Sequence, residues 1–133
     1  MLNLSTIGIW ILRLVAAVIL LQTLYFKFSA APESIYIFSK LGMEPWGRIG
    51  TGVLELIAGI LILIPATTVF GALLATGLMA GAILFHITKL GITVQDDGGQ
   101  LFIYALLVFV SSMALIIIYR DTLFAIKGFR IKT

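Results

Sequence analysis

The chain has 133 residues, of which 61% are hydrophobic and 11% charged, with a net charge of +3. Soluble domains are roughly 45–50% apolar and about 25% charged, so this composition indicates an integral membrane protein. The basic residues are few and scattered, which argues against nucleic acid as a partner, and the lack of cysteine excludes thiol exchange, Fe–S clusters and Cys-based zinc sites within the chain.

Four apolar runs have the length of membrane spans. They cover about residues 4–26, 45–64, 68–88 and 101–119. Each is near the ~20 residues that cross a hydrocarbon core of ~30 Å. The four spans and their three connections predict one domain, residues 1–133: an all-α, integral membrane, antiparallel four-helix bundle with both termini on one side. The first run has no basic leader region and carries Arg13, so it is interpreted as a retained span rather than a secretory signal.

The segments outside the spans are predicted to lie along the membrane surface. Pro32 can start a short interfacial helix between spans one and two, and Gly42 can end it. Its apolar side would consist of Ile35, Phe38 and Leu41. The basic tail, residues 120–133, is expected to lie on the membrane surface. Lys and Arg are balanced between the two sides, and we favour a multi-pass protein of the plasma (inner) membrane with cytoplasmic termini.

A carboxylate in the second span, Glu55, lies several turns from either end of its helix. Insertion scales place an ionised acid there at about +2.5 to +3.5 kcal/mol, so it needs compensation. At ~1.5 Å per residue, Arg13 in span one and Ser111 in span four reach a similar depth. We therefore predict a buried Arg13–Glu55 ion pair in a polar layer with Ser111. The pair either fixes helix register or forms a ligand-binding or proton-handling site.

A second polar layer is expected nearer the loops that join spans one to two and three to four. Its residues would be Lys27 and His86, which Gln100, Tyr104 and Asp96 or Asp97 can join. Together they predict a polar vestibule that opens on this loop side and leads down to Glu55. Lys27 most simply extends to the interface, and His86 either bonds a neighbour or hydrogen-bonds a quinone. No metal site is predicted, because His86 and Glu55 differ in depth by ~10 Å or more.

Three glycines are predicted to serve helix packing. Gly59, one turn from Glu55, lets another helix approach closely. Gly77 and Gly81 form a GxxxG motif in span three, on a face roughly opposite His86. The helix that packs there belongs either to this chain or to a second copy, which would make a homo-oligomer.

The pattern of these residues resembles the DoxX family of small four-helix membrane proteins, over about residues 12–119. The resemblance rests on Arg13 early in span one, Lys27 at its end, Glu55 with Ala58-Gly59 in span two, and a Gly98-Gly99 turn before span four. It implies a four-helix membrane fold. It also implies an association with quinone-linked oxidoreductases or thiol-redox and superoxide-defence proteins.

Three functions follow as hypotheses. The first is a membrane subunit that binds a small hydrophobic molecule, such as a quinone, for a redox partner protein, with Arg13, Glu55, His86 and Tyr104 contacting the ligand. The chain itself holds no complete catalytic or redox centre, and no catalytic residue is assigned. The second is a non-enzymatic membrane anchor or assembly scaffold, and the third, ranked last, is a small transporter.

Overall fold

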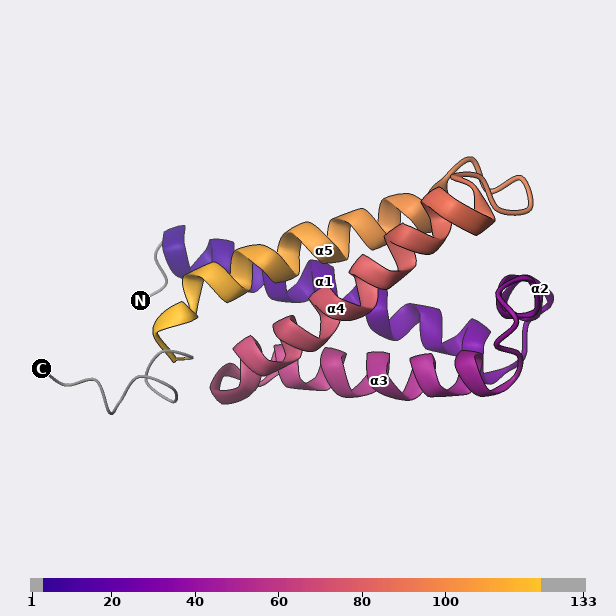
Figure 1. The fold of residues 1–133 in the computed structure, drawn as a ribbon. Helices are drawn as coiled ribbons and strands as arrows, with labels where there is room; N and C mark the ends of the chain where they lie inside the picture. The colour runs from indigo at the N-terminus through magenta and orange to yellow at the C-terminus, as the bar shows by residue number, and fades with distance from the viewer. Residues whose placement is uncertain (1–3, 123–133) are drawn as a thin grey trace, which may run out of the picture.

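A computed structural model describes residues 4–122, which fold as helices joined by short connections (Figure 1). The helices are α1 (Leu4–Phe28), α2 (Pro32–Lys40), α3 (Trp46–Leu63), α4 (Thr68–Phe85) and α5 (Gln100–Ile118). A 3₁₀ turn, Pro65–Thr67, joins α3 to α4, and a π-helical turn, His86–Leu90, extends α4. The predicted tail falls largely on residues 123–133, which lie outside the described residues.

Four of these helices are long and apolar enough to cross a membrane: α1, α3, α4 with its extensions, and α5. Helix α1 contacts α3 and α5, and α4 contacts the same two helices, so α1 and α4 are diagonal to each other. The start of α1 and the end of α5 lie at one end of the bundle (Figure 1). The predicted all-α, antiparallel four-helix membrane bundle is confirmed. The spans differ from the predicted ones by a few residues.

The short helix α2 lies across the loop end of the bundle, where Figure 1 shows it nearly end-on. Its limits follow the predicted signals, since Pro32 occupies the first turn and Gly42 ends the helix with φ +74°. The buried face consists of Ser34 and Phe38, however, while Ile35 stays exposed. Of the predicted apolar side, Phe38 therefore packs on the bundle, and Ile35 is left on the outer surface of the helix, where it can face the membrane interface.

Helices α3 and α4 pack tightly against each other near the termini. At Gly71, a Cβ atom would lie 2.7 Å from the backbone nitrogen of Ile62 in α3 and 2.8 Å from the Ala58 carbonyl oxygen. Gly59 lets α3 approach α1 closely, since a Cβ atom added to Gly59 would lie 2.8 Å from the Leu21 side chain. The predicted packing role of Gly59 is confirmed.

Helices α3 and α4 separate toward the loop end of the bundle (Figure 1). A Cβ atom added to Gly77 or Gly81 would meet nothing within 4 Å. Within the described residues, the GxxxG motif is therefore not a packing face.

Candidate functional site

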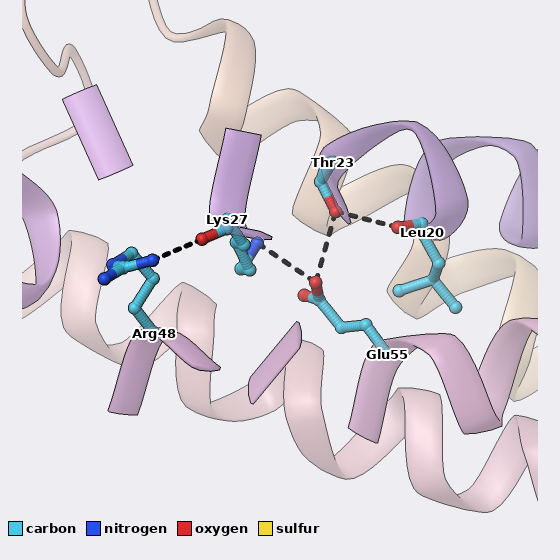
Figure 2. A network of polar contacts seen from close by, with 5 residues as sticks. All are labelled: Leu20, Thr23, Lys27, Arg48 and Glu55. Atoms are coloured by element: carbon cyan, nitrogen blue, oxygen red, sulfur yellow. Dashed lines mark hydrogen bonds and ion pairs between the residues drawn. The ribbon is translucent and has the colours of Figure 1, made fainter. Parts of the chain in front are cut away.

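The buried carboxylate of Glu55 is neutralised by Lys27 and not by Arg13. The Lys27 Nζ atom lies 3.0 Å from Glu55 Oε1, and the two side chains are 15% and 5% exposed. The Thr23 hydroxyl lies 3.1 Å from the same oxygen and 2.8 Å from the Leu20 carbonyl oxygen, so it donates to one at a time. Figure 2 shows Lys27 and Thr23 of α1 converging on Glu55 of α3. Lys27 thus points into the bundle, contrary to the expected interfacial position.

A second arginine, Arg48, holds the ends of α1 and α3 together beside this pair (Figure 2). Its Nη1 atom donates to the Lys27 carbonyl at 2.5 Å, and its Nε and Nη2 atoms contact the Glu44 carboxylate at 2.9–3.1 Å. A cation at the C-terminal end of α1 also interacts favourably with the helix dipole. The Glu44–Arg48 contact could have been predicted from the sequence, because residues four apart face each other on a helix. The contact of Arg48 with Lys27 could not.

The predicted Arg13–Glu55 pair is wrong. Arg13 Nε donates to the Thr68 hydroxyl at 3.2 Å and Nη2 to the Tyr119 hydroxyl. The guanidinium also lies over the rings of Trp10, at 4.5 Å, and Tyr119, at 5.6 Å. All six acidic side chains of the sequence belong to the described residues, and none of them forms a salt bridge with Arg13.

The direction in which helical side chains lean explains the error. Each Cα–Cβ bond tilts toward the N-terminus of its own helix, and long side chains extend that tilt. Helices α1 and α3 are antiparallel, so Arg13 leans toward the termini while Glu55 leans toward the loops. Lys27, at the loop end of α1, leans down toward Glu55. Depths counted from Cα positions alone place Arg13 and Glu55 together, and the side chains move them apart.

His86 is buried and has a defined partner. Its Nδ1 atom lies 3.0 Å from the Gly91 carbonyl oxygen, and its ring packs edge-on against Phe102 with centroids 5.6 Å apart. A carbonyl can only accept, so Nδ1 carries a proton. The interpretation of His86 as a histidine bonded to a neighbour is confirmed.

The loop that follows His86 is organised by Asp97, which the sequence placed in a turn beside the second polar layer. One carboxylate oxygen accepts from the backbone nitrogens of Val94 and Gly99 at 3.0 and 2.8 Å, and the other from Leu101 at 3.2 Å. Burial by itself would raise the pKa of Asp97. The three backbone donors, with the nearby His86, outweigh burial and hold the pKa below its ordinary value.

These elements surround a cavity of about 480 Å³ at the loop end of the bundle. Its walls come from all four spans, with α2 and residues 91–99 beside them. The polar residues that line it include Thr23, Lys27, Thr51, Glu55, His86, Asp97, Gln100 and Tyr104. Within it, Gln100 Nε2 donates to the Tyr104 hydroxyl at 2.8 Å. The structure therefore brings Lys27, Glu55, His86, Gln100 and Tyr104 to one cavity.

Three other predicted residues are placed differently from expectation. Ser111 is buried on α5 away from the cavity and forms no contact with Glu55. Gly77 and Gly81 line the cavity together with His86. The two glycines are therefore placed at the cavity and not at a helix contact within the described residues. Thr23, Arg48 and Thr51 are polar residues of this region that were not predicted as site residues.

Fold and cavity define a small multi-pass membrane protein whose loop-side half encloses a buried lysine–carboxylate pair. The model of the DoxX-like family matches residues 11–115, and the chain belongs to this family. No curated protein and no solved structure matches the chain.

Proposed function

We propose that the protein is the membrane subunit of a quinone-linked redox system and that its loop-side cavity binds a quinone or a comparable hydrophobic molecule with a polar head. The observation that supports this most strongly is the Lys27–Glu55 pair, which is buried in the wall of a cavity otherwise rich in apolar side chains. The volume of about 480 Å³ falls in the range of roughly 300–1,000 Å³ that small-molecule sites occupy.

In this proposal Lys27 is the main donor to the ligand. Its ammonium has three N–H bonds, and Glu55 takes one of them, so others can point to a carbonyl oxygen of the ligand. Tyr104 adds a hydroxyl at the other wall of the cavity. Arg13, which the sequence assigned to the ligand, has no part in this site.

The charges along the cavity favour a neutral head group. Glu33, Glu55 and Asp97 line it, against the single cation Lys27. An anionic ligand would be repelled, whereas a quinone carries no charge. The chain has no cysteine and one histidine, so electrons would come from a redox partner protein. We place the protein in the plasma membrane with cytoplasmic termini, so that the cavity faces the opposite side.

A second candidate function is a membrane anchor that assembles with another helix, from a partner or from a second copy of this chain. Gly77 supports it, since it is exposed and has no neighbour within the described chain. The anchor predicts that Glu55→Gln with Arg13→Met leaves partner recruitment intact and that bulky residues at Gly77 and Gly81 abolish it.

Lipid extraction with mass spectrometry, and thermal unfolding with added quinone, test the ligand. We expect a quinone to co-purify and to raise the melting temperature. The matched variants are Tyr104→Phe, inside the cavity, and Tyr119→Phe, which removes a hydroxyl bonded to Arg13 outside it. A lost hydrogen bond of about 1 kcal/mol should weaken quinone binding about fivefold in Tyr104→Phe only. If no quinone co-purifies and none raises the melting temperature, the proposal fails.

A further inference from the structure

The cavity reaches the outer surface of the bundle in the middle of a span. Its exposed lining residues are Gln22, Phe26, Glu33, Gly77, Gln95 and Gln100. Five of these lie toward the loop side, on the last turns of α1, on α2, in the loop before α5 or at its first residue. Gly77 is nine residues into α4, or roughly 14 Å from its start, which is close to the bilayer midplane.

The opening at this depth comes from the divergence of α3 and α4. Their backbones touch at Gly71, where a Cβ atom would lie 2.7 Å from the nitrogen of Ile62. Toward the loop end the two helices diverge (Figure 1), and on the neighbouring face of α4 Cβ atoms added to Gly77 and Gly81 would meet nothing within 4 Å. Neither glycine has a side chain to fill the gap. The exposed neighbours along α4, Leu73 and Leu84, are apolar and face lipid.

We infer that the gap between α3 and α4 at Gly77 and Gly81 is a lateral portal, through which the apolar tail of the cavity's ligand extends into the bilayer. This inference rests on the proposed function and narrows the ligand to an amphiphile with a neutral, hydrogen-bonding head and a long isoprenoid or acyl tail. Glu55 is nine residues into α3, so a head at the Lys27–Glu55 pair lies at about the depth of Gly77.

The size of the cavity also supports a ligand whose head lies in the cavity and whose tail lies in the bilayer. Pockets of roughly 300–1,000 Å³ enclose drug-sized molecules. A volume of about 480 Å³ therefore holds a ring with small substituents but not a tail of many isoprene units. A tail that stays in lipid exchanges one apolar environment for another and adds little to affinity. The tail-free head should accordingly bind almost as well as the whole molecule.

Closing the portal tests this inference. The variant Gly77→Leu/Gly81→Leu in lipid nanodiscs is compared with Gly50→Leu, since Gly50 is exposed on α3, has no neighbour within 4 Å and does not line the cavity. The probes are a methyl-substituted benzoquinone without a tail and the same head with a long isoprenoid tail. We expect the closed variant to lose about tenfold or more in affinity for the tailed probe and to keep the tail-free probe. The Gly50→Leu control should bind both.

The outcomes separate the portal from the proposed function. If the closed variant binds both probes like the wild type, the portal is overturned while the cavity remains a quinone site. If the wild type binds neither probe, the proposed function fails and the portal with it. If the double variant does not fold, a benzoquinone with a photoreactive group on its tail tests the portal in the wild type. Crosslinks to Leu73 or Leu84 support the portal, and crosslinks to Gln22 or Phe26 instead overturn it.

Discussion

The two ends of the bundle stabilise buried cations by different means. Near the termini, Arg13 is 3% exposed and is surrounded by neutral groups, the hydroxyls of Thr68 and Tyr119 and two aromatic rings. Near the loops, Lys27 is paired with the carboxylate of Glu55 beside a cavity. The first arrangement fills a packed end of the bundle. The second leaves donor groups of Lys27 available to a ligand.

The comparison shows that burial alone does not identify a functional charge in a membrane bundle. Arg13 and Glu55 are nearly equally buried, and both meet the general expectation that ionisable groups within spans have a function. Only Glu55 and its partner Lys27 border open space. A charged pair becomes a candidate site where the surrounding helices separate, and a structural contact where they are packed together.

The largest difference between the two ends should appear when each cation is replaced by methionine. Lys27→Met leaves the Glu55 carboxylate buried without its cation, and breaking a buried pair in this way costs about 3 kcal/mol or more. Arg13→Met leaves only neutral groups behind, and the Thr68 hydroxyl can still donate to the Ile62 or the Ile64 carbonyl, at 3.1 and 3.0 Å. Its cost should stay below about 1.5 kcal/mol. The measurement is the free energy of unfolding in mixed micelles.

The control for this comparison is the double variant Lys27→Met/Glu55→Leu. It removes both charges together and should regain most of the stability lost in Lys27→Met, because no unpaired charge remains. An Arg13→Met variant that is less stable than Lys27→Met would contradict the division of the bundle into a structural end and a site-bearing end.

A smaller effect is expected from adding one methyl group at either of two glycines of α4, one near its start and one in its middle. Gly71→Ala places Cβ less than 3 Å from the α3 backbone, which cannot move aside as a side chain can, and such overpacking costs about 1–3 kcal/mol. Gly77→Ala meets no neighbour and should gain up to about 0.5–1 kcal/mol, because alanine loses less backbone entropy in a helix. Opposite shifts in melting temperature would confirm the contrast, and equal losses would refute it.

Much of the fold could be predicted from the sequence because its signals are local. Runs of about 20 apolar residues define spans, Pro32 and Gly42 delimit α2, and both glycines of the Gly98-Gly99 turn have positive φ. Gly59 was also assigned correctly, since a glycine one turn from a buried carboxylate indicates close helix contact. The family followed from the order and spacing of these same features.

The partners of the charges could not be predicted from depth alone. Depth along a helix fixes Cα positions to within a few ångströms, whereas Arg and Lys side chains extend farther than that in a direction set by the polarity of the helix. Applying that tilt would have separated the Arg13 side chain from Glu55 and brought Lys27 toward Glu55. No local pattern in the sequence indicates that α3 and α4 diverge. Gly77 and Gly81 were therefore interpreted as packing residues.

The smallest predicted effect concerns Asp97, in the loop at the open end. Its pKa is lowered in the folded protein from the ordinary 3.8, so its contribution to stability is complete above that value. The contribution is lost as the pH falls through the folded pKa, because protonation removes the negative charge that strengthens the hydrogen bonds from Val94, Gly99 and Leu101. Hydrogen-exchange protection of these three amides should therefore decrease as the pH falls below 3.8. The Asp97→Asn variant should be less protected throughout and show no such step. A step of equal size in Asp97→Asn would assign the pH dependence to another group. It would contradict the stabilisation of this loop by the Asp97 carboxylate.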